Sequence, residues 1–122
     1  MNKELLRSTA IDMVQKGKGI LAADESSPTC AKRFETIGVE SSEINRNKYR
    51  DMLFTTPDIE KFISGVILFD ETLRQSTING NVPFADFLKK LGILVGIKVD
   101  KGAKVLASHN KEKVTEGLDG LR

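Results

Sequence analysis

Three uninterrupted apolar runs constrain the fold of this chain more than any other feature of its sequence. The runs occupy residues 19–24, 64–69 and 93–100, and the segments between them carry apolar residues at helical spacing. Runs without polar alternation are typical of strands that are covered on both faces of a sheet. Strands that alternate with helices predict parallel strands joined by crossover helices, which is an α/β architecture.

Start and stop signals place the predicted helices around these runs. Capping residues or prolines stand at the starts and glycines at several ends. The helices are expected to begin near Leu6, at Ser27-Pro28, at Ser41 or Ser42, at Thr56-Pro57 and at Pro83. Each predicted strand ends in polar residues, as strands do at the catalytic edge of a (β/α)8 barrel. A complete barrel takes about 250 residues, so we expect residues 1–122 to be the amino-terminal part of one barrel domain, with its first three strands.

Charge and composition exclude several classes of function. The chain has 19 basic and 17 acidic residues, and no run of like charges marks a nucleic-acid-binding surface. No apolar run approaches the roughly 20 residues that a membrane helix needs. The single cysteine cannot form an internal disulfide, and the start of the chain lacks a targeting pattern. We therefore expect a cytoplasmic protein without nucleic-acid or membrane partners.

The end of the first apolar run carries the first candidate site residues. Asp24 ends the run, and Ser26, Ser27 and Pro28 follow it at the start of a predicted helix. Hydroxyls and free amides at a helix start suit an anion such as phosphate. The same residues would also serve as an ordinary helix cap, and the local pattern alone favours that interpretation.

The third apolar run carries a second charged group. Lys98 and Asp100 are two positions apart in a strand, so both side chains point to one side of the sheet. In a barrel they would face the substrate, whereas elsewhere they would form a compensated ion pair, and the residues alone leave both interpretations open. Further positive charge near the predicted strand ends comes from Lys32, Arg33, Arg74 and Lys101.

Two residues that often carry chemistry have simpler interpretations here. Cys30 lies on the apolar face of its predicted helix, which favours packing over nucleophilic attack. His109 stands in a polar stretch without a second histidine at a ligand spacing, and we predict it in a loop. The sequence thus predicts no metal site and no cofactor.

Several segments follow one another in a specific order and spacing. They are residues 17–26 (GKGILAADES), 31–33 with 37–38, 45–46 with 49–50, 65–69 with 71–73, 96–102 (GIKVDKG) and 117–121 (GLDGL). In order and spacing they resemble the class I, Schiff-base fructose-bisphosphate aldolases, and the similarity extends from about Leu5 to Arg122. Since the motifs are co-linear over nearly the whole chain, this resemblance is specific.

The resemblance implies a complete (β/α)8 barrel enzyme of glycolysis and gluconeogenesis. Such enzymes reversibly cleave fructose 1,6-bisphosphate into dihydroxyacetone phosphate and glyceraldehyde 3-phosphate. A lysine on a later strand forms a covalent iminium with the substrate, and neither a metal nor a cofactor takes part. The family usually forms tetramers, so a homo-oligomer is implied as well.

The resemblance also implies roles for particular residues. Asp24 matches the aspartate beside the Schiff-base lysine, where a carboxylate stabilises the iminium and orients the C4 hydroxyl. Ser26 and Thr29 match hydroxyl residues that hold the distal phosphate. The remaining implied site residues are Lys98 and Arg33 as contacts to the bisphosphate and Asp100 as a support that pairs with lysines.

The sequence departs from the family pattern in two ways. Thr29 stands where serine is usual and Pro28 where glycine is common, although the hydroxyl is kept. The Schiff-base lysine, the paired glutamates and the second phosphate site have no match, because Lys98, Lys101 and Lys104 do not fit the nucleophile's motif. We therefore expect the 122-residue chain alone to be inactive.

Two alternatives to a partial aldolase remain from the sequence. The chain could be a short, non-catalytic barrel-fragment module that binds or docks onto intact subunits. It could also be the start of another Schiff-base barrel lyase, which is disfavoured because the resemblance extends through all three predicted strands.

Overall fold

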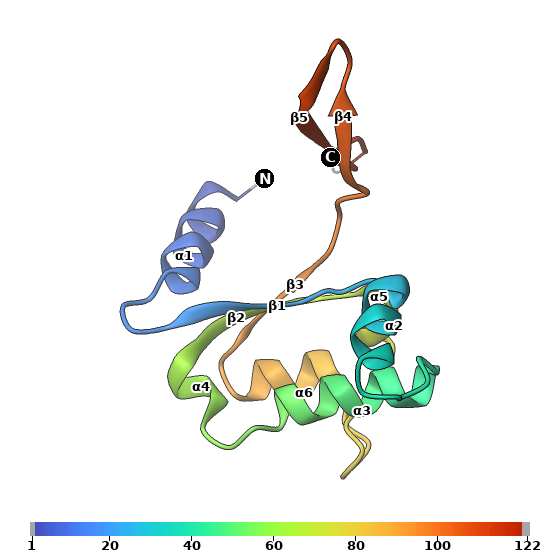
Figure 1. Cartoon of the computed structure of the whole chain (residues 1–122). Helices are drawn as coiled ribbons and strands as arrows, with labels where there is room; N and C mark the ends of the chain where they lie inside the picture. The colour runs from blue at the N-terminus through green and yellow to red at the C-terminus, as the bar shows by residue number, and fades with distance from the viewer. Residues whose placement is uncertain (1, 121–122) are drawn as a thin grey trace.

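The chain folds into helices and parallel strands in the alternating order that its apolar runs predict (Figure 1). The computed structural model describes residues 2–120. Its elements are α1 (Lys3–Met13), β1 (Gly19–Ala23), α2 (Ser27–Glu35), α3 (Glu43–Phe54), α4 (Ile59–Phe62), β2 (Ile63–Leu68), α5 (Asp70–Leu73), α6 (Phe84–Lys90), β3 (Leu94–Ile97), β4 (Gly102–Leu106) and β5 (His109–Glu116). None of the described helices is long and apolar enough to cross a membrane.

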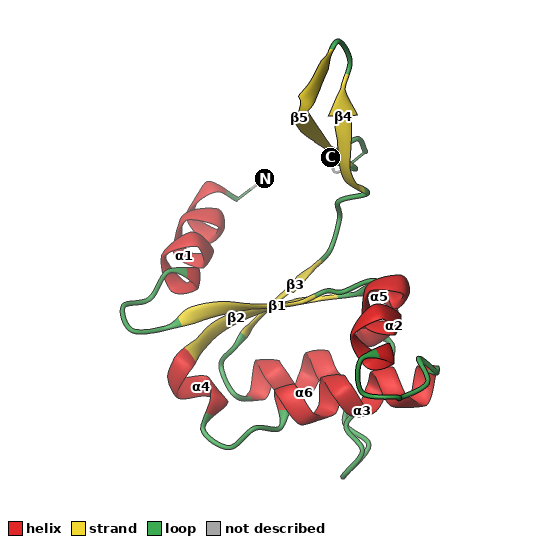
Figure 2. Cartoon of the chain, in the orientation of Figure 1, coloured by secondary structure: helices red, strands yellow, loops and turns green. Residues whose placement is uncertain are grey.

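A three-stranded parallel sheet forms the centre of the fold. The strand order is β1-β2-β3, and the register pairs Leu21 with Val66 and Val66 with Val95. Helices α3 and α6 lie together on one side of this sheet, whereas α1 lies on the other side near one end of the strands (Figure 2). The architecture confirms the predicted α/β class with parallel strands, and the described strands do not close a barrel.

The core lies between the sheet and the helices α3 and α6. Phe54 of α3 and Phe84 of α6 are fully buried, with their ring centroids 5.1 Å apart in an edge-to-face arrangement. Leu88 follows Phe84 by one helical turn and packs into the same cluster with Val66 and Leu68 of β2. These contacts fix β2 against the helices and thereby set the positions of its two neighbours.

The expected burial of the strands on both faces needs correction. Strand β2 is mostly buried, but Ile20 of β1 is 48% exposed and Ile97 of β3 is 42% exposed. Among the described residues, α3 and α6 cover one face of the sheet, so side chains that point to the other face meet fewer neighbours. Helical spacing would place Ile37 with Cys30 and Phe34, and Met52 with Tyr49 and Leu53, on apolar helix faces, but Ile37 and Met52 are both exposed.

The structure differs from prediction after the third strand. The strand ends at Ile97 instead of residue 100, because the carboxylate of Asp100 accepts a hydrogen bond from the amide of Gly102 and turns the chain. An antiparallel hairpin of β4 and β5 follows, and His109, which was predicted in a loop, begins β5. The described residues do not include Leu121, the last residue of the GLDGL motif, or Arg122, where the resemblance ends.

Candidate functional site

Residues from the first and third strands meet at the carboxyl edge of the sheet. Asp24 directly follows β1, and Lys98 directly follows β3, where its amide still bonds to the carbonyl of Leu68 in β2. The ammonium of Lys98 donates to Asp24 Oδ2 at 3.3 Å and to Asp100 Oδ1 at 2.5 Å. The parallel topology thus brings a cation and two carboxylates together from distant parts of the chain.

A cavity of about 460 Å³ opens beside this cluster. It is lined by Ser26, Thr29, Phe69, Asp70, Lys98, Asp100, Lys101 and Gly102. The predicted site residues Ser26, Thr29, Lys98 and Asp100 therefore line one cavity, and Asp24 adjoins it through its contact with Lys98. Phe69, Asp70 and Gly102 were not foreseen as site residues. Phe69 and Gly102 lie within the quoted motifs, but their side chains carry no charged or hydrogen-bonding group.

The charges around Lys98 keep this side chain protonated. Its hydrogen bond to Asp100 is the main cause that raises the pKa of the Lys98 ammonium; burial opposes this rise, and Asp24 adds to it. The same contact lowers the pKa of Asp100, with help from the amide of Gly102. The Lys98 side chain is 26% exposed, so a positive charge borders the cavity.

The start of helix α2 supplies two hydroxyl groups. Ser26 is the N-cap of α2, yet its side chain makes no capping hydrogen bond. Its hydroxyl lies 3.1 Å from the hydroxyl of Thr29, and both residues line the cavity. Asp24 pairs with Lys98 and does not occupy the N-cap, so the capping interpretation fails for Asp24, whereas Ser26 does hold the N-cap position. Two hydroxyls, the first-turn amides and an ammonium form a polar surface suited to phosphate.

Arg33 does not line this cavity. Its guanidinium forms an ion pair with Glu25 and donates to the hydroxyl of Tyr49 at 3.0 Å, while its side chain is 54% exposed. Glu25 raises the pKa of Arg33, and burial together with Glu25 raises the pKa of Tyr49. Arg74 is likewise committed to a local ion pair with Asp70. Positive charge at the cavity therefore comes from Lys98 and Lys101 instead.

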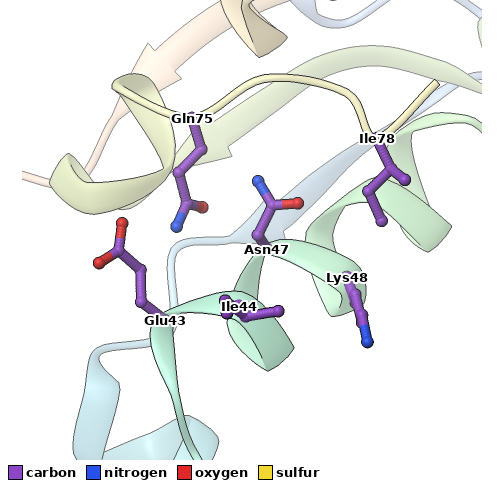
Figure 3. Close-up of a pocket in the computed structure, with 6 residues that line it drawn as sticks. All are labelled: Glu43, Ile44, Asn47, Lys48, Gln75 and Ile78. Atoms are coloured by element: carbon purple, nitrogen blue, oxygen red, sulfur yellow. The ribbon is translucent and has the colours of Figure 1, made fainter. Parts of the chain in front are cut away.

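A second cavity, of about 390 Å³, is less suited to an anion (Figure 3). It is lined by Glu43, Ile44, Asn47, Lys48, Gln75 and Ile78. The exposed Ile44 and Ile78 make it largely apolar, and Lys48 points away from the carboxamide of Gln75. None of the predicted site residues borders it.

The arrangement of acidic side chains offers no metal site within residues 2–120. No group of three or more histidine, cysteine, aspartate or glutamate side chains lies close enough to hold an ion there. Near the first cavity, Asp24 and Asp100 face the ammonium of Lys98, and Asp70 pairs with Arg74.

Comparison with known proteins assigns the fold and the family. The family model of the glycolytic class I fructose-bisphosphate aldolases matches residues 4–122. A probable class 1 aldolase of Xanthomonas axonopodis is 57% identical over the whole chain, and the aldolase of Drosophila melanogaster is 55% identical over 98% of it. The chain belongs to the class I fructose-bisphosphate aldolase family.

A solved structure agrees with this assignment. The aldolase of Plasmodium falciparum, crystallised with TRAP and a small-molecule inhibitor, superposes with a TM-score of 0.86 at 51% identity over 96% of this chain. The match covers 33% of that protein, and the Xanthomonas relative is covered to 36%. The chain thus spans about a third of the length of the relatives it matches.

Proposed function

We propose that this chain supplies one side of the sugar-bisphosphate site of a class I fructose-bisphosphate aldolase. The observation that supports this most is the contact of Lys98 with Asp24 beside a cavity that also holds the hydroxyls of Ser26 and Thr29. The reaction is the reversible cleavage of fructose 1,6-bisphosphate into two triose phosphates. The family membership and the polar chemistry of the cavity favour the same substrate class.

Phosphate binding follows from the charges that border the cavity. Lys98 remains cationic because its carboxylate partners raise its pKa, so it attracts a phosphate dianion before and throughout the reaction. The hydroxyls of Ser26 and Thr29 donate to phosphate oxygens once the mutual contact between them opens. These groups hold the sugar by its distal phosphate.

Asp24 has a different task in this proposal. Its side chain is 22% exposed and lies at the end of β1, beside the cationic Lys98. A carboxylate placed there stabilises the positive charge of an iminium and accepts a hydrogen bond from a sugar hydroxyl. In this proposal the Schiff-base lysine lies in the part of the family's barrel that residues 1–122 do not cover, because no lysine here fits its motif.

Further properties of the family accompany this proposal. We infer a homo-oligomeric, cytoplasmic enzyme, because the family usually forms tetramers and the one cysteine, Cys30, is free and buried. The short docking module considered from the sequence has no observation in its favour, and we do not propose it.

The test uses a chimera, called the full-length chain below. It joins residues 1–122 to the part of the Xanthomonas axonopodis relative that this chain does not cover. We expect this full-length chain to cleave fructose 1,6-bisphosphate at a rate within about tenfold of the unaltered relative, because the exchanged segment is 57% identical and cores tolerate substitution when pattern and volume are kept. A folded but inactive full-length chain, beside an active relative, would overturn the proposal.

A further inference from the structure

We propose that Arg50, buried on helix α3, is a positioning residue that holds the loop of residues 24–26 in the shape the substrate site requires. The inference rests on the proposed function, because the loop carries Asp24 and Ser26. In the sequence, Arg50 belongs to one of the motifs that resemble the family (residues 49–50), but we predicted no role for it in the site. It neither lines the cavity nor touches Lys98, so any effect on the reaction must pass through the loop.

The guanidinium of Arg50 binds the backbone on both sides of Asp24. Its Nε donates to the carbonyl of Ala23 at 2.8 Å, and its Nη2 donates to the carbonyl of Glu25 at 2.9 Å. The arginine is only 2% exposed, so water does not compete for these donors. Two fixed carbonyls on either side of one residue leave the backbone of Asp24 little freedom to rotate.

Further contacts tie the same guanidinium to the helix that follows the loop. Nη1 donates to the sulfur of Cys30 at 3.3 Å, within α2. Nη2 also lies 3.0 Å from Glu25 Oε2, a contact of opposite charges whose geometry is not that of a hydrogen bond. One side chain, that of Arg50, therefore bonds to the end of β1, to the loop and to the first turns of α2.

Glu25 receives support from its other oxygen as well. Its Oε1 pairs with Arg33 and accepts a hydrogen bond from Tyr49 at 3.1 Å, and the carboxylate is only 9% exposed. A carboxylate this buried depends on its cationic partners to offset its lost solvation. Loss of Arg50 would leave Glu25 Oε2 and the two loop carbonyls without their buried partner. A lysine keeps the charge, but its single ammonium cannot reproduce the planar fork that spans these acceptors.

Arg46 provides a matched control on the same helix. It lies one turn before Arg50 and binds both oxygens of Glu71, at 2.7 and 2.6 Å, with 15% of its side chain exposed. Its other hydrogen bonds go to Ser41, and none reaches residues 24–26. Replacement of either arginine removes several hydrogen bonds made by a guanidinium of α3. Only replacement of Arg50 removes the bonds to the loop of residues 24–26.

The experiment compares Arg50→Lys with Arg46→Lys in the full-length chain. We expect Arg50→Lys to lower kcat/KM for fructose 1,6-bisphosphate by about 10²-fold, because small displacements of positioning groups cost that much. Arg46→Lys should keep kcat/KM within about twofold of the parent, because the hydrogen bonds of Arg46 go to Glu71 and Ser41 and leave the loop of residues 24–26 in place. Urea unfolding of both variants measures their stabilities, so that a loss of activity from unfolding is recognised. Equal kcat/KM values for two folded variants would overturn the proposal.

A second readout does not depend on activity. Amide hydrogen exchange in residues 25–30 should become about tenfold faster in Arg50→Lys, while residues 70–74 stay unchanged, because local opening follows the loss of local contacts. Arg46→Lys should show the opposite pattern, since it contacts Glu71. Unchanged exchange at residues 25–30 in Arg50→Lys would overturn the positioning role even if the full-length chain lacked activity. An inactive parent with the expected exchange pattern would instead contradict only the proposed function.

Discussion

Lys98 and Asp24 stand 74 positions apart in the chain, and their charged groups lie 3.3 Å apart in the structure. The contact joins the ends of β3 and β1, which do not pair with each other but flank β2. It therefore forms only when both parallel pairings have the correct register, since a shift by one residue would turn these side chains to the other face. The charge arrangement of the site is a direct consequence of the sheet.

Residues 1–122 alone should neither cleave fructose 1,6-bisphosphate nor form a covalent adduct with dihydroxyacetone phosphate on borohydride reduction. The reason is that no lysine in residues 1–122 matches the motif of the family's Schiff-base lysine. Lys98 is in addition paired with two carboxylates that raise its pKa, and an amine must lose its proton before it attacks a carbonyl. Mass spectrometry after reduction checks this, with the Xanthomonas relative as the positive control. A stoichiometric adduct on Lys98 or Lys101 would contradict the assignment of roles.

The isolated chain should also associate in solution. Strands β1 and β3 form the two edges of the described sheet, and Ile20 and Ile97 on these strands are substantially exposed. Unpaired strand edges with apolar side chains promote pairing with other chains. Light scattering during size-exclusion chromatography measures the mass. A monodisperse monomer with a cooperative thermal transition would show that the described residues are self-sufficient.

The ion pair of Glu71 with Arg46 should make stability depend on pH in the acid range. Hydrogen bonds from Arg46 lower the pKa of Glu71 below its ordinary value of 4.5 in the folded state. A carboxyl group whose pKa is lower in the folded state than in the unfolded state stabilises the folded state. This stabilisation is complete at pH values above the unfolded-state pKa, and it is lost as the pH falls through the folded-state pKa. We expect Glu71→Gln to reduce the free energy of unfolding of the full-length chain at pH 7 and to have little effect at the acid end.

The matched control for that prediction is Glu35→Gln. Glu35 is exposed at the end of α2, so its replacement should change stability little at either pH. Urea unfolding curves at pH 7 and below pH 4 give the comparison. A penalty for Glu71→Gln that persists undiminished in acid would mean that the lost interaction is packing and not charge.

The alternating pattern of the fold could be predicted because apolar runs and punctuating residues report local structure. Helix α6 shows this, since Phe84 and Leu88 lie one turn apart and both are buried in the core. The hairpin of β4 and β5 could not be foreseen in the same way. Every residue of β5 is exposed, so the strand has no buried face whose alternation would mark it.

The site was foreseen in part, and the missed residue has a physical explanation. The resemblance to the family nominated Ser26, Thr29 and Lys98, which line one cavity. Arg33 was nominated too, but it pairs with Glu25 at the surface. Arg50 was missed because arginine is ordinarily a surface residue, and its burial depends on carbonyls of a loop that lies distant in sequence.

The kinetic effect of Asp24 tests the central claim, that this segment carries one side of an aldolase site. In the full-length chain, Asp24→Asn should lower kcat about 10²- to 10³-fold with a small change in KM, because a carboxylate beside the iminium acts mainly once positive charge develops. Lys98→Ala should act mainly through a raised KM, because its ammonium meets a phosphate that is already charged in the ground state.

Steady-state kinetics with fructose 1,6-bisphosphate, on folded variants of matched stability, provides the measurement. The account predicts that the two substitutions separate, with the loss in kcat at Asp24 and the loss in binding at Lys98. Near-normal kcat for Asp24→Asn would contradict it, and Asp24 would then be only a structural partner of Lys98.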